Sequence, residues 1–162
     1  MPLKAGDEIP EVALYEMTES GPASVQTSEL FSAKKIAVFA LPGAFTPTCS
    51  KAHLPGFVTK SDELFRLGID DILCISVNDA WVMSAWGQQQ NADRIRMLAD
   101  GSADFTDAID MSVDLTAKGM GVRSHRYAMI VDDGTVSWIG IDAPGQFEQS
   151  SAESLEKALK GG

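Results

Sequence analysis

The sequence predicts an α/β fold built on one central sheet, and three observations carry this prediction. Two near-continuous apolar runs, residues 36–41 and 72–77, are typical of strands buried on both faces. Each run is followed by a segment whose apolar residues recur at helical spacing, so strands and helices alternate. Two further apolar runs flank the pair Asp133-Gly134, which favours a tight antiparallel turn. We therefore expect a central mixed β-sheet flanked by helices, antiparallel at its C-terminal end.

The length and composition of the chain indicate one domain. The chain has 162 residues, 44% of them hydrophobic, so we expect a single domain over residues 1–162. The net charge of −10 argues against a general nucleic-acid or membrane-surface binder. No apolar run approaches the roughly 18 residues of a membrane-spanning helix. Residues 1–8 contain neither an apolar signal core nor a basic transit segment, so we expect a cytoplasmic protein.

The longest predicted helix covers residues 47–67. Its apolar residues recur at roughly helical spacing, and Gly68 marks its end. Pro55 lies inside this pattern. Because proline has no N–H group and its ring clashes with the carbonyl four residues earlier, we expect a kink after the first two turns.

The other predicted elements are short. We expect strands at residues 12–16, 24–27, 97–99, 127–131 and 136–141, and a helix near residues 104–109. The segment Ser20-Gly21-Pro22 predicts a turn between the first two strands, because glycine and proline favour turns. The rest of residues 100–124 is rich in Gly, Asp, Ser and Thr and is predicted to form loops.

Two helix starts are marked by polar residues. Asn78-Asp79 follows an apolar run and is expected to cap the next helix. The last helix is expected to start at Ser150 or Ser151, because Ser150 followed by Glu153 fits a capping box.

Cys49 is the most informative residue of the chain. It follows the apolar run 36–41 and a Pro/Gly turn. In the helix predicted next, Thr46 is the N-cap, Pro47 is at the first position and Cys49 is at the third. Free backbone N–H groups and the positive end of the helix dipole point at that position, and both favour a thiolate over a thiol. The sequence therefore predicts one reactive cysteine.

The turn before Cys49 has the chemistry that peroxide reduction requires. Only a thiolate attacks the O–O bond, and the departing oxygen needs hydrogen-bond donors because charge develops on it. We expect the hydroxyl of Thr46 to donate to a peroxide oxygen and Pro42 to form a rigid, dry wall. A cation is also needed near the sulfur. The candidates precede the last predicted hairpin: Arg123, His125 and Arg126.

Further motifs accompany the one at Cys49. They are His53-Leu54-Pro55-Gly56-Phe57, Ser76-Val77-Asn78-Asp79, Ala85-Trp86-Gly87, Ala99-Asp100-Gly101 and Arg123-Ser124-His125-Arg126-Tyr127. Together with Pro42-Gly43-Ala44-Phe45-Thr46-Pro47-Thr48-Cys49-Ser50 they closely resemble the peroxiredoxins of the type II/type 5 subfamily, over nearly the whole chain. The resemblance implies a thioredoxin-like fold and thiol peroxidase activity on hydrogen peroxide and organic hydroperoxides. Within it, Cys49 corresponds to the peroxidatic cysteine, Pro42 and Thr46 to pocket residues, and Arg126 to the active-site arginine.

The resemblance also bears on how the enzyme is reduced. Some members carry a resolving cysteine before the last helix, but residues 143–151 contain none. Cys74 lies where plant and several bacterial type II proteins have their second cysteine, and reduction in that branch involves glutaredoxin with glutathione, or thioredoxin. Cys74 also suits simple packing in the predicted strand 72–77, so both roles remain open.

Four more residues are assigned supporting roles. His53 lies one helical turn after Cys49 and either stabilises the thiolate or has a packing or hydrogen-bonding role. Arg123 either supports Arg126 or lies on the surface. Phe45 and Trp81 are large aromatic residues at the ends of elements, which favours an interface, and the resemblance likewise implies a homodimer through these regions.

Other functions are less well supported. Two cysteines and two histidines at these spacings form no standard zinc site, so we expect no metal and no cofactor. A thioredoxin-type oxidoreductase needs a second cysteine within one turn of Cys49, but residues 50–53 are Ser-Lys-Ala-His. A redox sensor or holdase that uses Cys49 oxidation to signal stays open, and turnover distinguishes it, because a sensor reacts once and an enzyme many times.

Overall fold

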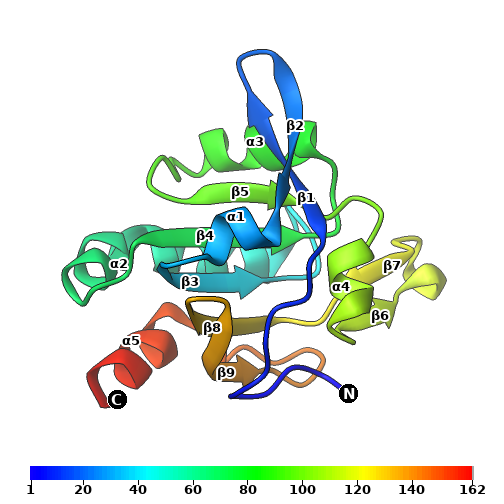
Figure 1. Cartoon of the computed structure of the whole chain (residues 1–162). Helices are drawn as coiled ribbons and strands as arrows, with labels where there is room; N and C mark the ends of the chain where they lie inside the picture. The colour runs from blue at the N-terminus through cyan, green and yellow to red at the C-terminus, as the bar shows by residue number, and fades with distance from the viewer. Residues whose placement is uncertain (162) are drawn as a thin grey trace.

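The fold is built on one central sheet (Figure 1). The computed structural model describes residues 1–161. Within these residues, the seven strands of the sheet pair in the order β2-β1-β5-β4-β3-β8-β9. The strands are β1 (Ala13–Thr18), β2 (Gly21–Gln26), β3 (Lys35–Ala40), β4 (Asp71–Ser76), β5 (Arg96–Ala99), β8 (Tyr127–Asp132) and β9 (Thr135–Ile141). The strands β3, β4 and β5 are parallel, and every other pairing in the sheet is antiparallel. The predicted mixed sheet with an antiparallel C-terminal end is therefore confirmed.

Helices cover both faces of this sheet (Figure 1). One face packs against α2 (Leu54–Arg66), α3 (Ala80–Gln89) and α5 (Ala152–Gly161), and the other against α1 (Thr27–Phe31) and α4 (Asp104–Ala108). Successive side chains of a strand point to opposite faces, so β3 contributes Ala37 and Phe39 to one core and Ile36 and Val38 to the other. Burial of each large apolar side chain contributes about 1.5–3 kcal/mol, which makes these two cores the main source of stability.

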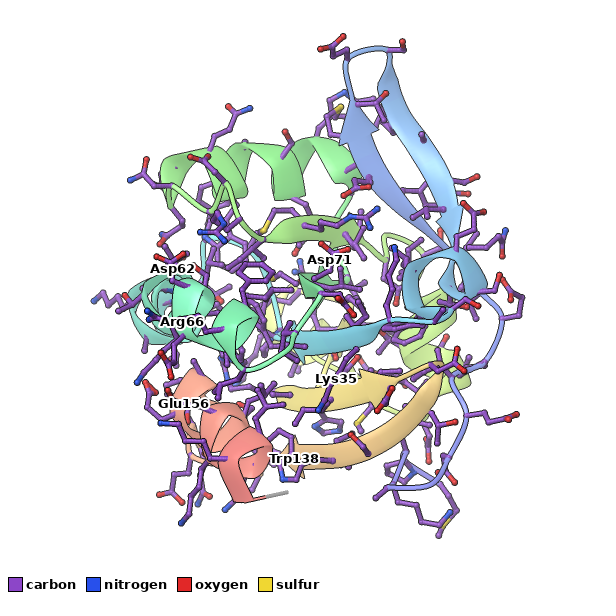
Figure 2. All side chains as sticks on the ribbon, turned by 60° about the vertical axis from the view of Figure 1, so that its left-hand side comes forward. Lys35, Asp62, Arg66, Asp71, Trp138 and Glu156 are labelled. Atoms are coloured by element: carbon purple, nitrogen blue, oxygen red, sulfur yellow. The ribbon has the colours of Figure 1, made fainter. Side chains whose placement is uncertain are left out.

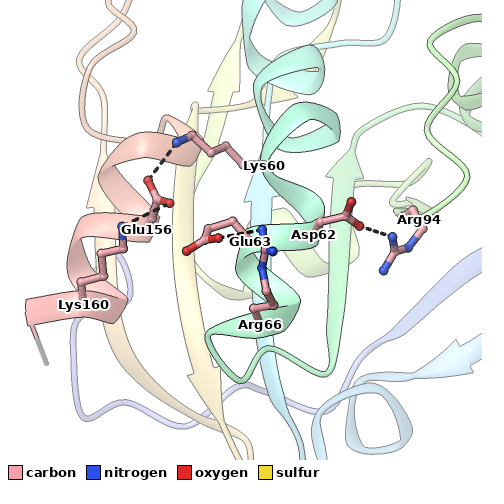
Figure 3. A network of polar contacts seen from close by, with 7 residues as sticks. All are labelled: Lys60, Asp62, Glu63, Arg66, Arg94, Glu156 and Lys160. Carbon is pink, nitrogen blue, oxygen red and sulfur yellow. Dashed lines mark hydrogen bonds and ion pairs between the residues drawn. The ribbon is translucent and has the colours of Figure 1, made fainter.

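Ion pairs join the outer surfaces of neighbouring elements (Figure 3). Lys60 of α2 contacts Glu156 of α5 at 3.0 Å, and Lys160 approaches the same carboxylate at 3.6 Å. Asp62 of α2 pairs with Arg94, which precedes β5. Figure 2 shows Asp62 and Glu156 on the outside of the helices, away from the sheet. Because ion pairs at or near the surface contribute about 1 kcal/mol or less each, they supplement the apolar cores.

The helix predicted at residues 47–67 contains a π-helical segment, η1 (Cys49–His53), immediately before α2. The N–H group of Leu54 donates to the carbonyl of Cys49, five residues earlier. Proline at position 55 explains this widening, because it lacks an N–H group and its ring clashes with the carbonyl four residues before it. The helix is therefore irregular before Pro55, as a wide turn that carries Cys49, and the predicted kink stays a prediction.

The first hairpin turns earlier than predicted. Strand β1 ends at Thr18 and β2 begins at Gly21, so the turn lies at residues 19–20 and not at residues 20–22. The hydroxyl of Thr18 donates to the carbonyl of Gly21 at 2.6 Å, and Gly21 has a φ of 105°, which favours glycine. Pro22 is accommodated within β2 because β2 is an edge strand.

The structure also contains elements that the sequence analysis missed. Residue 27 begins α1 and does not end a strand. Within residues 100–124, a second small sheet of β6 (Ser112–Asp114) and β7 (Val122–Ser124) flanks a short helical turn, η2 (Thr116–Lys118). These segments contain too few apolar residues to show the periodicity of a helix or a strand, so their structure depends on tertiary contacts.

Both predicted helix starts are confirmed, the second at Ser151, whereas the capping box predicted for Ser150 is wrong. The carboxylate of Asp79 accepts the N–H of Val82 at 2.8 Å at the start of α3, as expected. At the start of α5, however, the hydroxyl of Ser151 accepts the N–H of Ser154 at 3.1 Å. Ser150 does not form the predicted capping box, because its hydroxyl is buried against Asp142.

The predicted C-terminal hairpin is confirmed. Strands β8 and β9 are joined by Asp133 and Gly134, whose φ angles are 48° and 81°. Two successive positive φ angles are those of the tight turn that matches the twist of a hairpin. On its other side β8 pairs antiparallel with β3, so the start of β8 lies beside the end of β3, which decides the geometry of the site described next.

Candidate active site

Cys49 lies in the first turn of the helix that follows β3, and its side chain is fully buried. The carbonyl of Thr46 accepts the N–H of Ser50 at 2.9 Å, so the helical hydrogen bonds begin at Thr46 as predicted. Both cysteines of the chain, Cys49 and Cys74, are free. The predicted placement of one thiol at a helix N-terminus is therefore what the structure shows.

Arg126 is the cation beside this thiol. Its Nη2 atom donates to Sγ of Cys49 at 3.3 Å. The contact follows from the sheet: Tyr127, the first residue of β8, pairs with Ala40, the last residue of β3. Antiparallel pairing thus places the residue before β8 next to the loop that leaves β3. A guanidinium at this distance stabilises a negative sulfur through a charge-assisted hydrogen bond.

His53 orients the guanidinium of Arg126. Its Nδ1 atom lies 2.9 Å from Nη1 of Arg126, and its Nε2 atom lies 2.9 Å from the carbonyl oxygen of Ser150. Since a carbonyl only accepts and a guanidinium only donates, the ring carries its proton on Nε2 and accepts at Nδ1. Burial, and then the charge of Arg126, lower the pKa of His53 to about 3, so the ring is neutral. His53 therefore does not supply positive charge to the thiolate; it directs the charge of Arg126.

The hydroxyl of Thr46 has a different role from the one predicted. It donates to the carbonyl of Gly43 at 2.7 Å, and a carbonyl cannot donate in return. The hydroxyl proton of Thr46, which was expected to bind a peroxide oxygen, therefore already forms a hydrogen bond within the turn. The oxygen of Thr46 keeps its lone pairs, so it is suited to accept a hydrogen bond from the O–H group of a hydroperoxide. The expectation that Thr46 donates to peroxide is wrong in this respect.

Arg123 supports the wall of the site and does not touch the sulfur. Its Nη1 atom donates to the carbonyl of Pro42 at 3.2 Å, and its Nε atom donates to the carbonyl of Met120 at 2.9 Å. A Cβ atom on Gly43 would lie 2.6 Å from Nη1, so the absence of a side chain there allows the arginine to approach. Of the two arginines considered from the sequence, Arg126 contacts Cys49 and Arg123 braces Pro42.

A cleft of about 420 Å³ opens beside Arg126. It is bounded by the turn that contains Pro42 and Thr46, by the β6–β7 region, and by residues 142–147. Much of its lining is apolar, from Val113, Leu115, Met120, Pro144 and Phe147. The cleft therefore offers a largely apolar approach to the polar site.

Residues 142–150 contribute to the site in a way that no sequence pattern indicated. Beyond the carbonyl of Ser150, the ring of Phe147 lies 5.0 Å from that of His53 and 5.7 Å from the guanidinium carbon of Arg126. The carboxylate of Asp142 accepts hydrogen bonds from residues 148, 149 and 150. Burial opposes the charge of Asp142, but these hydrogen bonds outweigh it and lower its pKa. These contacts span up to 97 positions of sequence, so local spacing carries no sign of them.

Cys74 lies in the middle of β4 and belongs to the same core as Cys49. Burial, and then the proximity of Cys49, raise the pKa of the Cys74 thiol well above its usual range. The thiol is therefore held in its protonated form inside the sheet, where it packs as a small apolar residue.

The two aromatic residues predicted at an interface are exposed. Phe45 is 50% exposed and Trp81 is 66% exposed. They lie on connected elements, because the N–H of Ala44 donates to the side chain of Asn78 at 2.9 Å, just before α3. The turn that contains Phe45 and the start of α3 therefore form one surface next to the site.

Residues 1–161 contain neither a membrane-spanning helix nor a cluster of metal-binding side chains. None of their helices is both long and apolar enough to cross a membrane. They also contain no group of three or more His, Cys, Asp or Glu side chains placed to hold a metal ion.

Comparisons with known proteins identify the family. The family model described as Redoxin matches residues 4–155. Peroxiredoxin-2E, chloroplastic, of Arabidopsis thaliana is 46% identical over 162 residues, which cover 97% of this chain and 69% of that protein. The hybrid peroxiredoxin hyPrx5 of Haemophilus influenzae is 40% identical over 157 residues, 95% of this chain and 65% of that protein.

A solved structure shows the same relationship. The crystal structure of reduced Prx3 from Vibrio vulnificus in complex with H2O2 matches with a TM-score of 0.94 and 48% identity, over 97% of this chain and 99% of that one. Since the family model spans most of the chain and these relatives match it nearly end to end, the chain belongs to the redoxin family as a peroxiredoxin, a thiol peroxidase with a thioredoxin-like fold.

Proposed function

We propose that Cys49 is the peroxidatic cysteine and that it reduces hydrogen peroxide and organic hydroperoxides. The contact of 3.3 Å between Nη2 of Arg126 and Sγ of Cys49 carries this proposal. It brings a fixed positive charge to the single thiol that lies at a helix N-terminus, and both features favour the thiolate. The solved structure of Vibrio vulnificus Prx3, which is 48% identical, contains H2O2 and supports the choice of substrate.

In the first step, the thiolate of Cys49 attacks the hydroxyl oxygen of the hydroperoxide. The S–O bond forms as the O–O bond breaks, which gives a sulfenic acid on Cys49 and an alkoxide or hydroxide that takes a proton from solvent. The guanidinium of Arg126 stabilises the developing negative charge, and Thr46 accepts the hydrogen bond of the peroxide O–H group. The apolar side chains of the cleft accommodate the organic part of larger hydroperoxides.

We further propose that an external thiol reduces the sulfenic acid. Cys74 lies in a fully buried strand, so a bond between the two cysteines would require local unfolding of the first helical turn. Glutathione instead condenses with the sulfenic acid, which forms a mixed disulfide and releases water. A glutaredoxin thiolate then attacks the glutathione sulfur and frees the thiolate of Cys49. Thioredoxin is the second candidate for this reducing partner.

The assembly and location that fit this activity are a homodimer in the cytoplasm. Phe45 and Trp81 give the dimer an exposed aromatic surface beside the active site. The catalytic cycle consumes reduced thiols, which the cytoplasm supplies.

A panel of reductants tests the activity. Peroxide consumption is measured with glutaredoxin plus glutathione, with thioredoxin, and with glutathione alone. We expect many turnovers per enzyme with at least one of the first two. One equivalent of peroxide consumed, and no more with any reductant, would indicate a redox sensor instead.

A further inference from the structure

We propose that Asp142 is a positioning residue of the peroxidase site. Its carboxylate holds residues 148–150 in place, so that the carbonyl of Ser150 orients His53 and, through His53, Arg126. This inference rests on the roles of Cys49 and Arg126 proposed above. Asp142 does not touch the sulfur. Its effect is carried by a continuous series of hydrogen bonds that ends at the guanidinium.

The first part of the series is the carboxylate itself. Oδ1 of Asp142 accepts the N–H groups of Glu148 and Gln149 at 2.9 and 2.7 Å. Oδ2 accepts the N–H group of Ser150 at 3.1 Å and its hydroxyl at 2.5 Å. The side chain is buried, with 4% of the residue exposed. Four hydrogen bonds use the acceptor capacity of a carboxylate, so the position of these three residues is tied to one charged group.

The backbone of Asp142 is also attached to the site. Its N–H group donates to the carbonyl of Arg126 at 3.0 Å. Residue 142 directly follows β9, whose pairing with β8 begins next to Arg126. The same residue therefore holds residues 148–150 by its side chain and the backbone of Arg126 by its N–H group.

Gly140 allows the 148–150 segment to lie this close to β9. A Cβ atom at position 140 would lie 2.2 Å from the carbonyl oxygen of Gln149, a distance that no side chain tolerates. The close approach of the two backbones is thus built into β9, two residues before Asp142.

The second part of the series runs through the imidazole. The carbonyl of Ser150 accepts the Nε2 proton of His53, which leaves Nδ1 free to accept from Nη1 of Arg126. If the carbonyl moves away, the Nε2 proton loses its acceptor, and nothing on that side holds the ring in the orientation that presents Nδ1 to Nη1 of Arg126. The guanidinium then loses the contact that directs Nη2 to the sulfur of Cys49.

The chain offers a matched control in Asp100. This carboxylate is also buried, with 3% of the residue exposed, and it accepts the N–H groups of Phe105 and Thr106 and the hydroxyl of Thr106. These contacts lie at the start of α4 and do not include His53 or Arg126. Asp100→Asn therefore reproduces the loss of a buried carboxylate without disturbing the proposed series.

The experiment compares Asp142→Asn with Asp100→Asn. The rate constant of Cys49 oxidation by hydrogen peroxide is measured in a single turnover at a temperature where circular dichroism shows each variant folded. A displacement of about 1 Å can cost about 100-fold in rate, so we expect Asp142→Asn to react about 10- to 100-fold more slowly than the wild type. Asp100→Asn should react at the wild-type rate. If Asp142→Asn does not fold, Ser150→Ala removes one of the four hydrogen bonds and should slow the reaction several-fold.

Two further measurements separate positioning from a merely structural role. In an Arg126→Ala background, Asp142→Asn should slow the reaction by no more than about twofold, because both changes act on one contact. The ¹⁵N shifts of the His53 ring should show a hydrogen-bonded proton on Nε2 in the wild type and a changed Nε2 shift in Asp142→Asn, because that proton loses its acceptor. The inference is overturned if Asp142→Asn has the wild-type rate constant and the wild-type ¹⁵N shifts of the His53 ring. It is also overturned if Asp142→Asn slows the reaction as much in the Arg126→Ala background as it does in the wild type. A wild-type rate in Arg126→Ala itself would instead overturn the proposed function.

Discussion

The imidazole of His53 donates its Nε2 proton to the carbonyl of Ser150 at 2.9 Å, although 97 positions separate the two residues. Burial of the ring, and then the charge of the guanidinium on its other side, keep His53 neutral and lower its pKa to about 3, although the hydrogen bond to Ser150 acts in the opposite direction. A residue that could have served as a second positive charge next to Cys49 therefore acts as an acceptor for Arg126.

The stability of the protein should depend on pH through this residue. The unfolded chain binds a proton at His53 near pH 6.5, whereas the folded protein does so only near pH 3. The unfolded state binds more protons between these values, so the contribution of His53 to the free energy of unfolding should fall as pH falls from 6.5, by about 1.4 kcal/mol per pH unit at most. Urea unfolding at pH 7, 5.5 and 4.5 checks this. The slope should be shallower in His53→Gln than in the wild type. Equal slopes in the two proteins would contradict the assignment of a buried neutral ring.

Replacing Cys49 should abolish the peroxidase activity. Serine has nearly the same shape, but its hydroxyl stays protonated near neutral pH and attacks an O–O bond poorly. We expect Cys49→Ser to fold normally and to lose essentially all peroxide consumption in the presence of glutaredoxin and glutathione. Circular dichroism provides the folding control. Substantial turnover by the folded variant would show that another group reacts with the peroxide.

The two arginines near the site should differ in their effect on rate. Arg126 donates to the sulfur, whereas Arg123 donates to the carbonyls of Pro42 and Met120. Loss of one donor to a transition state costs about 10²–10³ in rate, so Arg126→Ala should slow peroxide reduction by that factor. Arg123→Ala should slow it less, through the loosened turn at Pro42. Stopped-flow measurement of both variants decides this, and equal small effects would exclude Arg126 as the stabilising cation.

Cys74 should be dispensable when an external thiol is supplied. Its side chain is buried in β4 and its pKa is raised, so its thiol is a poor nucleophile in the folded protein. We expect Cys74→Ser to keep most of its activity with glutaredoxin and glutathione. Mass spectrometry after one equivalent of peroxide provides an independent check. A quantitative bond between Cys49 and Cys74, with a variant that is inactive under every reductant, would assign the resolving role to Cys74.

The exposed surface around Trp81 should mediate dimer formation. Substitution by aspartate would place an unpaired charge in the interface and weaken association by several kcal/mol. Sedimentation at micromolar concentration should show a dimer for the wild type and a monomer for Trp81→Asp. Tyr15→Asp, at an exposed aromatic residue on β1, serves as the control and should remain dimeric. A monomeric wild type, or a dimeric Trp81→Asp, would rule out this interface.

The features that the sequence determined by itself are those with a local physical cause. Apolar runs predicted the buried strands β3 and β4, and Asp133-Gly134 predicted a hairpin because its positive φ angles occur at these residues. The helix start predicted at Cys49 depends only on the preceding turn and on neighbouring backbone N–H groups. For the same reason, Pro55 was sufficient to predict an irregular helix, although not its π-helical form.

The remaining features of the site depend on contacts between segments that are distant in the sequence. The residue pattern gave Arg123, His125 and Arg126 as candidate cations, and the resemblance implied Arg126. The pairing of β8 with β3 is what brings Arg126 to Cys49. The hydroxyl of Thr46 donates to the carbonyl of Gly43. The hydroxyl of Ser150 donates to the carboxylate of Asp142 and therefore does not cap α5. In each case a donor had several acceptors available along the chain. Burial selects the one partner whose hydrogen bond compensates for the loss of water, and only the packed structure places that partner within reach.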